Sequence, residues 1–336
     1  VKVDGRFQPR PGRCGGLSGP APRRPGGGRP VVVFGFRLMS LPAITPPADL
    51  PPLPGRPTAA SKRDFGRVVV VGGSVGMAGA PALSAMAALR SGAGLVELLV
   101  PEPVAGIAAG FDPCVMTRGL AASPAGTFAA AAGELIADAV ERASAVAVGP
   151  GMGRSEETAD LVARLWREAA VPAVFDADAL WAIARLPADR LADHRGPRIL
   201  TPHAGEMLRL AGRDPSGPEA TDRGQLSALA RAFAAAAAAV VVLKGSGTLV
   251  TGGGREAINE TGNPGMATAG TGDVLTGVVA ALLAAGLAAF PAARLAAWIH
   301  GVAGDAAAAD LGQISMTARD LLDRLFVGFR VAEVVE

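Results

Sequence analysis

The chain contains the stretch Asn263-Pro264-Gly265-Met266-Ala267-Thr268-Ala269-Gly270-Thr271-Gly272-Asp273, and an apolar helical pattern follows from Val274. A glycine-rich turn before a helix predicts an anion site, because backbone N–H groups point outward and the helix dipole favours negative charge. A carboxylate at Asp273 would repel that anion. It is useful there as a base that takes a proton from a hydroxyl attacking a phosphate. The alternative is an acidic residue that stabilises the first turn of the helix.

Composition limits the size and the core of the protein. The 336 residues are enough for one large or two ordinary domains. Half of them are hydrophobic, much of that half is alanine, and tyrosine is absent. We therefore expect a core of closely packed Ala, Val and Leu side chains.

The positive charge is concentrated at the start of the chain. Residues 1–60 hold nine Lys and Arg against two Asp and Glu, a local charge of +7, so the overall +2 leaves −5 for residues 61–336. Residues 1–30 are mostly Gly, Pro and Arg and cannot offset their ordering entropy. We expect a disordered head over residues 1–60, one domain over residues 61–326 and a tail over residues 327–336.

Met39 lies inside this head, which leaves two interpretations open. The natural protein could begin near Met39, with residues 1–38 not native, or the head could be a basic arm with affinity for nucleic acid. We favour the first interpretation and expect no nucleic-acid partner.

Cysteine content and hydropathy indicate a cytoplasmic protein without a membrane partner. Cys14 and Cys114 are too few for a disulfide framework or a zinc site, which favours a reducing compartment. The weakly polar stretch 274–290 stops at Pro291 and opens on the anion motif. We therefore expect it to be a buried helix rather than a membrane span.

Strand and helix patterns alternate from residue 65 onward. Expected strands are 68–71, 95–100, 145–148, 173–175, 199–200 and 240–243, with a hairpin of 248–251 and 256–259, and expected helices are 81–91, 274–285, 292–311 and 318–325. Thr201 is the expected N-cap of a helix with Pro202 at its first position. The alternation predicts an α/β fold with a mostly parallel sheet and helices on both faces.

Polar and glycine clusters follow five of these strands directly. They are 72–80, 149–153, 176–178, 201–206 and 244–248. In open α/β sheets the loops at the carboxyl ends of the strands form the ligand crevice. The first cluster lacks the register of a dinucleotide fingerprint, and the chain has no P-loop motif, so the turn 263–273 is the best phosphate site.

The residues of these clusters, and of several neighbouring segments, resemble the motifs of one protein family. The relevant motifs are Lys62-Arg63-Asp64-Phe65-Gly66-Arg67-Val68, Gly72-Gly73-Ser74, Gly79-Ala80-Pro81, Gly149-Pro150-Gly151-Met152-Gly153, Asp176-Ala177-Asp178-Ala179-Leu180, Leu200-Thr201-Pro202-His203-Ala204-Gly205-Glu206, Leu243-Lys244-Gly245-Ser246-Gly247-Thr248 and Thr261-Gly262-Asn263-Pro264-Gly265-Met266-Ala267-Thr268. Over residues 60–326 the chain is similar to the ADP-dependent NAD(P)H-hydrate dehydratase family of the ribokinase-like superfamily. The resemblance implies a three-layer α/β/α sandwich.

Three positions depart from the family pattern. Arg63 stands where Gly is usual, Ser61 where His is common, and Ala269 where Gly is usual. Alanine costs little unless the position needs a positive φ, so we interpret these changes as tolerated. The 60 residues before the domain cannot encode the epimerase domain that often precedes it, so we expect functional pairing with a separate NAD(P)H-hydrate epimerase.

The resemblance implies a repair reaction on damaged nicotinamide cofactors. The substrate is the 6S hydrate of NADH or NADPH, and ADP is the co-substrate. The terminal phosphoryl group moves to the ring hydroxyl, and phosphate then leaves, which gives NAD(P)H, AMP and phosphate. Mg²⁺ bridging the nucleotide phosphates is expected, although no residue can be named as its ligand.

The resemblance also assigns roles to residues. Asp273 matches the base, and the backbone of Gly270, Thr271 and Gly272 would stabilise the transferring phosphoryl group. The remaining positions are Lys244, Gly245, Ser246, Gly247, Thr248 and Gly272 for the nucleotide, and Ala80, Gly153, His203 and Asp273 for the hydrated substrate. The family tends to form tetramers, so a homo-oligomer is expected.

Several of these side chains have simpler interpretations. His203 could be a helix cap or a surface residue, and Asp176 and Asp178 could cap the next helix instead of supporting a metal or phosphate. Lys244 could be a solvated charge. Glu206 is expected to bind helix N–H groups, and His300 and Asp305 are expected to be structural polar residues near the site.

Two other functions compete with this interpretation. A ribokinase-like kinase for a thiazole or pyrimidine alcohol would share Asp273 and its glycines. A non-catalytic nucleotide-binding module would not need Asp273. Preference between ADP and ATP, and between the hydrates of NADH and NADPH, cannot be read from the residues.

Overall fold

The computed structural model describes residues 44–333. The expectations of disorder in residues 1–43 and of a non-native segment 1–38 lie outside the described residues, as do residues 334–336. Within residues 44–333, no helix is both long enough and apolar enough to cross a membrane.

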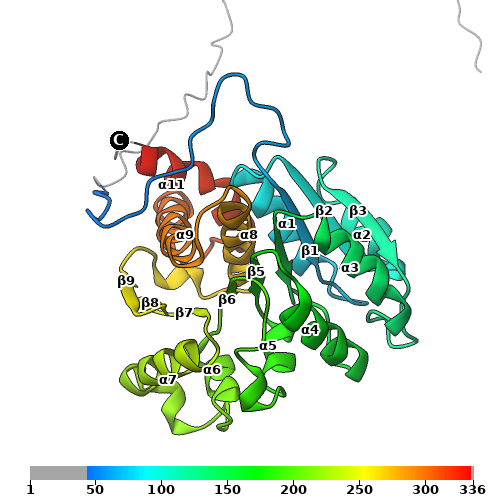
Figure 1. The fold of residues 1–336 in the computed structure, drawn as a ribbon. Coiled ribbons are helices and arrows are strands. Elements are labelled where there is room, and N and C mark those ends of the chain that lie inside the picture. The colour runs from blue at the N-terminus through cyan, green and yellow to red at the C-terminus, as the bar shows by residue number, and fades with distance from the viewer. Residues whose placement is uncertain (1–43, 334–336) are drawn as a thin grey trace, which may run out of the picture. The chain divides into compact units, whose positions relative to one another are not determined.

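A nine-stranded sheet in order β3-β2-β1-β4-β5-β6-β7-β8-β9 forms the middle of the described part of the chain (Figure 1). The strands are β1 (Arg67–Val71), β2 (Leu95–Pro101), β3 (Met116–Leu120), β4 (Ala145–Val148), β5 (Ala173–Phe175), β6 (Arg198–Leu200), β7 (Val240–Leu243), β8 (Thr248–Gly252) and β9 (Arg255–Asn259). The seven strands β1 to β7 are parallel, and β8 and β9 form an antiparallel hairpin at one edge. The predicted mostly parallel sheet is confirmed.

Helices cover both faces of the sheet. They are α1 (Gly79–Arg90), α2 (Glu102–Ala109), α3 (Gly133–Glu141), α4 (Glu156–Glu168), α5 (Asp178–Ile183), α6 (Ala204–Leu210), α7 (Arg223–Ala236), α8 (Thr271–Ala284), α9 (Ala289–Leu311), α10 (Ala318–Asp323) and α11 (Leu325–Ala332). Helices α1, α2 and α8 to α11 pack on one face, and α3 to α7 pack on the other. This is the predicted three-layer sandwich.

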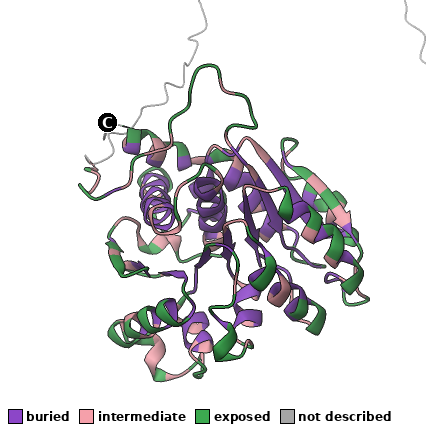
Figure 2. Cartoon of the chain, viewed as in Figure 1, coloured by how far each residue is buried: buried purple, intermediate pink, exposed green. Residues whose placement is uncertain are grey.

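The alternation of side chains along β1 explains the two cores. Val68 and Val70 pack with the helices of one face, whereas Val69 and Val71 pack with those of the other, because successive side chains of a strand point to opposite faces. All four valines are fully buried, as expected for a parallel strand covered on both sides. Figure 2 shows this burial in the strands and in α8 and α9.

The predicted start of α6 is wrong. The helix begins at Ala204 with His203 as its N-cap, not with Thr201 as cap and Pro202 as first residue. The Thr201 hydroxyl donates instead to the carbonyl oxygen of Phe175 at 3.4 Å. Thr201 is thus tied to the neighbouring strand, and the chain turns into the helix two residues later.

Both ends of the domain extend beyond their predicted boundaries. Residues 44–60 contain no helix or strand, yet Leu50 is buried in the core and Asp49 pairs with Arg294 at 3.2 Å. The expectation of a disordered segment as far as residue 60 is therefore wrong for 44–60. At the other end, residues 327–332 belong to α11 rather than to a tail, and Gly328 packs directly against Ile299 of α9.

Candidate active site

A cavity of about 870 Å³ opens at the carboxyl ends of the strands. Its lining consists of His203, Ala204, Lys244, Gly245, Ser246, Gly247, Thr248, Asn259, Glu260, Thr261, Gly262, Asn263, Pro264, Met266, Ala267, Thr268, Ala269, Thr271, Gly272, Leu275, Ala297, His300 and Gly301. These residues follow β6, β7 and β9 or lie on α8 and α9. Its volume is within the roughly 300–1,000 Å³ range of sites for small molecules and cofactors.

The turn before α8 takes the conformation that its glycine allows. Gly270 is the N-cap of α8 and is left-handed, with φ 93° and ψ −18°. The Thr271 hydroxyl closes the turn by donating to the carbonyl oxygens of Met266 (2.9 Å) and Thr268 (3.0 Å). Ala269 does not have a positive φ, so alanine is tolerated at this position. The first N–H groups of α8 have no partner within the helix and suit an anion.

His300 and Asp305 support this turn from α9. Burial lowers the pKa of His300 to about 4, so the neutral ring donates from Nε2 to the Thr271 carbonyl oxygen at 2.9 Å. The Asp305 carboxylate accepts from the Gly262 N–H at 2.9 Å and from the Asn263 side chain at 3.0 Å. The structural roles expected for both residues are confirmed.

Lys244 is an internal cation at the end of β7. Its Nζ lies 2.8 Å from Asp176 Oδ1 and 3.7 Å from Glu206 Oε2, and only 20% of the side chain is exposed. Burial favours the neutral amine, but the charges of Asp176, Glu206 and Asp273 outweigh it, so the pKa of Lys244 is raised. The alternative of a solvated charge is wrong. A retained ammonium group suits a phosphate ligand.

Neither Asp176 nor Asp178 caps the following helix. Ala177 is the N-cap residue of α5, which has no side-chain cap. The buried Asp176 carboxylate accepts from Lys244 and from the Thr276 hydroxyl, each at 2.8 Å. The Asp178 carboxylate accepts from the Gly153 N–H at 3.0 Å and from Arg154 Nε at 2.9 Å. Both carboxylates therefore connect loops that are distant in sequence.

Asp273 has the properties of a base near neutral pH. It lies in the first turn of α8. Burial, together with the charges of Asp176, Glu206 and Asp178, raises the pKa of Asp273 to about 7, although Lys244 acts in the opposite direction. A carboxylate that only stabilised the helix dipole would have a lowered pKa. The raised value suits a group that accepts and releases a proton.

His203 caps α6 and faces the cavity. Its Nδ1 accepts from the N–H groups of Gly205 (3.1 Å) and Glu206 (3.4 Å), while Glu206 accepts from the His203 N–H at 2.8 Å. The alternative of a cap for His203 and the expected N–H-binding role of Glu206 are confirmed. Partial burial and the charge of Lys244 lower the pKa of His203, and its role as a substrate contact stays a prediction.

The structure brings one group of predicted residues together at the cavity: His203, Lys244, Gly245, Ser246, Gly247, Thr248, Thr271 and Gly272. Ala80, Gly153, Gly270 and Asp273 are not part of this lining. Ala80 is in the first turn of α1 and lies against Gly151, and Gly153 is held by Asp178. The charges of Lys244, from the first group, and of Asp178, which holds Gly153, both act on Asp273.

Two polar residues that were not predicted from the sequence order this region. Thr276 is fully buried and binds Asp176, and Ser84 is fully buried and binds the backbone of Asp273. Both are hydroxyl residues inside helices that are otherwise apolar. A hydroxyl residue in an apolar helix can be recognised in the sequence as a candidate for a buried hydrogen bond, because a buried hydroxyl needs a partner.

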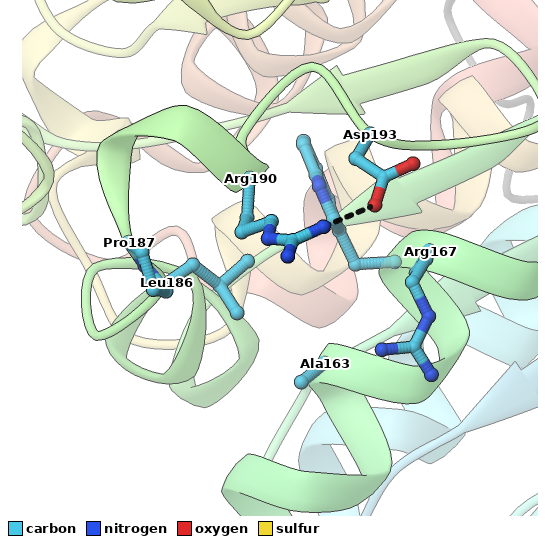
Figure 3. A pocket seen from close by; sticks show the side chains of 7 residues that line it. Ala163, Arg167, Leu186, Pro187, Arg190 and Asp193 are labelled. Carbon is cyan, nitrogen blue, oxygen red and sulfur yellow. Dashed lines mark hydrogen bonds and ion pairs between the residues drawn. The ribbon is translucent and has the colours of Figure 1, made fainter.

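A second cavity of about 310 Å³ lies between α4 and the loop after α5. Figure 3 shows Arg190 and Asp193 pointing toward each other across it, 3.5 Å apart. Each neutralises the other, and Arg167 pairs with Glu168 on the same helix. The cavity lacks a glycine turn at a helix start, so the larger cavity is the candidate active site.

The seven parallel strands, the terminal hairpin and the acidic residue in a glycine-led first turn define a protein of the ribokinase-like fold. A sequence model described as NAD(P)H-hydrate dehydratase matches residues 68–326, and the chain belongs to this family.

Individual relatives agree with the family. A bifunctional NAD(P)H-hydrate repair enzyme from Moorella thermoacetica is 46% identical over 274 residues, which cover 81% of this chain and 51% of the relative. An ADP-dependent (S)-NAD(P)H-hydrate dehydratase from Xanthomonas campestris is 36% identical over 87% of this chain and 98% of the relative. The chain thus spans about half the length of the bifunctional relative.

A solved structure shows the same fold. The ADP/ATP-dependent NAD(P)H-hydrate dehydratase from Bacillus subtilis, crystallised with ATP and Mg²⁺, superposes with a TM-score of 0.71 at 28% identity. The match covers 84% of this chain and 95% of that one.

Proposed function

We propose that this protein catalyses the ADP-dependent dehydration of (6S)-NAD(P)H hydrate to NAD(P)H, with release of AMP and phosphate. The observation that carries the proposal is the position of the Asp273 carboxyl group in the first turn of α8, next to the left-handed Gly270. Its pKa, raised to about 7, supports a role as a base. Membership of the family and the ADP-dependent relative support the choice of reaction.

The nucleotide occupies the large cavity in this proposal. Residues 244–248 contact the AMP portion, and Lys244 brings a positive charge to the phosphates. The N–H groups at Gly270, Thr271 and Gly272 stabilise charge on the phosphoryl group as it moves. The left-handed Gly270 is the N-cap of α8, and Thr271 and Gly272 line the cavity.

The hydrated nicotinamide approaches from the other side of Asp273. Ala80, Gly153 and His203 position it so that its ring hydroxyl reaches the carboxylate. Asp273 takes the hydroxyl proton while the hydroxyl oxygen attacks the terminal phosphorus of ADP, and AMP leaves. The phosphorylated ring then loses phosphate and a ring proton, and the ring double bond forms. Phosphate is a far better leaving group than hydroxide, so the nucleotide drives the dehydration.

Magnesium belongs to the proposal as a partner of the nucleotide. Within residues 44–333 no group of three or more His, Cys, Asp or Glu side chains is arranged to hold a metal ion. Asp176 is paired with Lys244, and Glu206 accepts from the His203 N–H. The residues therefore fit an ion held mainly by phosphates and water, as is usual for Mg²⁺. When bound, it would neutralise phosphate charge.

We further propose a cytoplasmic homotetramer that works with an NAD(P)H-hydrate epimerase. The low cysteine content supports the compartment, and the resemblance to the family supports the assembly. The bifunctional relatives, which match this chain over about half their length, support the pairing with an epimerase.

A direct assay tests the reaction. Purified protein is mixed with hydrated NADH and Mg²⁺, with ADP or ATP in parallel, and recovery of the reduced-nicotinamide absorbance is followed. We expect recovery with ADP and formation of AMP. Recovery only with ATP would show that ADP is not the phosphoryl donor. If neither nucleotide restores absorbance while a thiazole or pyrimidine alcohol is phosphorylated, the protein is a kinase and the dehydratase proposal fails.

A further inference from the structure

We propose that Asp176 is a positioning residue that fixes the Lys244 ammonium group beside Gly272, and so determines where the transferring phosphoryl group lies. This inference rests on the proposed function for its catalytic consequence. The geometry that supports it is independent of the reaction.

Asp176 uses both oxygens of its carboxylate to join separate elements. It follows β5 directly and is 1% exposed. Its Oδ1 accepts from Lys244 Nζ at the end of β7, and its Oδ2 accepts from the Thr276 hydroxyl on α8, each at 2.8 Å. A buried carboxylate with two charged or polar partners has one orientation, because any rotation would break a hydrogen bond in a dry environment.

This carboxylate brings the lysine against the glycine turn. A methyl group built on Gly272 would lie 3.2 Å from Lys244 Nζ and 3.7 Å from Asp176 Oδ2. A free lysine side chain has four rotatable bonds and loses much entropy when it is held in one place. Asp176 therefore holds the ammonium group at the site before the nucleotide arrives, which favours binding and correct orientation.

The backbone next to Asp176 is constrained as well. Ala177 has φ 51° and ψ −120°, and it is one of two non-glycine residues with a positive φ among those described. Such a conformation is costly and persists where the surrounding structure requires it. Here it turns the chain so that Asp176 faces Lys244 while Asp178, two residues later, binds the Gly153 N–H.

Glu206 does not replace Asp176 in this role. Its nearest oxygen is 3.7 Å from Lys244 Nζ, beyond hydrogen-bond length. The same oxygen, Oε2, already accepts from the His203 N–H at 2.8 Å. Glu206 adds negative charge around the lysine, and Asp176 alone fixes the position of the ammonium group.

A double-mutant cycle tests the inference. The variants are Asp176→Asn, Lys244→Met and the double substitution, and Asp193→Asn is the control that removes an exposed carboxylate far from the site. For Asp176→Asn we expect kcat to fall on the order of 100-fold, as for a misplaced catalytic group, with a weaker affinity for ADP and an unchanged KM for the hydrate. The control should keep the wild-type values.

The decisive result is whether the two losses combine. If Asp176 acts through Lys244, the double variant loses no more than Lys244→Met alone, because residues that share one interaction are not additive. Losses that multiply would mean that Asp176 acts on the reaction or on a metal independently, and the inference would be overturned. Wild-type kcat and ADP affinity in Asp176→Asn would also overturn it.

Two further measurements keep the test clear. The ADP affinity of the wild type, the two single variants and the double variant can be measured by calorimetry without turnover. The positioning role is therefore tested even if the wild-type chain does not dehydrate the hydrate. That result would refute only the proposed function. If Asp176→Asn does not fold, Thr276→Val keeps the shape of the side chain and removes its hydrogen bond to Asp176, together with the 3.1 Å hydrogen bond to the Gly272 carbonyl oxygen. It should lower ADP affinity about tenfold, the usual weight of a hydrogen bond to a charged group. Unchanged affinity would contradict the inference.

Discussion

The Ser84 hydroxyl donates a hydrogen bond of 2.7 Å to the backbone carbonyl oxygen of Asp273, although the two residues are 189 positions apart. This bond joins the middle of α1 to the first turn of α8. The two helices approach closely at the same place, because Gly277 of α8 packs against the Ser84 carbonyl group. The helix that carries Ala80 is thereby tied to the helix that carries the proposed base.

Replacing the proposed base should separate binding from turnover. Asp273→Asn keeps the shape of the side chain and removes the proton acceptor. We expect nucleotide affinity close to that of the wild type and a loss of turnover of roughly 100-fold or more, the range for loss of a general base. Calorimetry with ADP and the absorbance assay measure the two quantities. Turnover that survived the substitution would make Asp273 the wrong base.

The reaction should require a deprotonated Asp273. Its pKa is raised to about 7 in the folded protein, so the fraction of active enzyme rises with pH and levels off above that value. We expect kcat/KM to show an acid limb with an apparent pKa of about 7. A profile that stayed flat down to about pH 5 would contradict this assignment, because an ordinary carboxylate titrates near 4.

The same shift should make the wild type less stable at high pH than a variant without the charge. The folded pKa of Asp273 is about 7, above its ordinary value of 3.8, so the folded state binds the proton more tightly than the unfolded state. The cost of the buried charge is complete above about pH 7 and decreases as the pH falls from there. Asp273→Asn should therefore melt at a higher temperature than the wild type at about pH 8, and the difference should shrink toward about pH 5. An equal difference at both pH values would rule out the titration as its cause.

Two neighbouring glycines should fail in different ways. At Gly270 an alanine would be strained by the φ of 93° and would crowd Leu83 at 2.8 Å and Ala318 at 2.9 Å, so we expect a stability loss of about 1–3 kcal/mol. At Gly272 an alanine would meet only the side-chain ends of Lys244 and Asp176, no closer than 3.2 Å. That variant should fold normally and lose ADP affinity. Thermal unfolding and calorimetry distinguish the two, and equal melting temperatures would contradict the contrast.

Two truncations should locate the start of the domain. A chain that begins at Met39 should keep the stability and activity of the full chain, because the removed segment is rich in Gly, Pro and Arg. A chain that begins at residue 61 also loses the burial of Leu50 and the partner of Arg294. Exposure of one buried leucine site costs roughly 1.5–3 kcal/mol, so its melting temperature should fall. Equal melting temperatures would show that residues 44–60 add nothing to the fold.

The sequence by itself determined the architecture of this domain. Runs such as the valines of β1 are typical of buried parallel strands between layers of helices, and glycine at 270 permits a left-handed turn that few other residues adopt. The same local patterns placed the glycine and polar clusters at the strand ends. They also placed Asp273 in the first turn of a helix, because capping and turn preferences act over a few neighbouring residues.

Only the tertiary structure decided what the charged residues do. Lys244 and Asp176 are 68 positions apart, and neither one's local sequence shows that they meet in the core. The pKa of Asp273 depends on burial and on the charges of four residues from other parts of the chain. His203 rather than Thr201 is the N-cap of α6, and Thr201 binds the neighbouring strand. Desolvation and charge–charge interactions depend on distance in space. The local sequence therefore fixed where these side chains stand along the chain, and packing fixed how they ionise and what they bind.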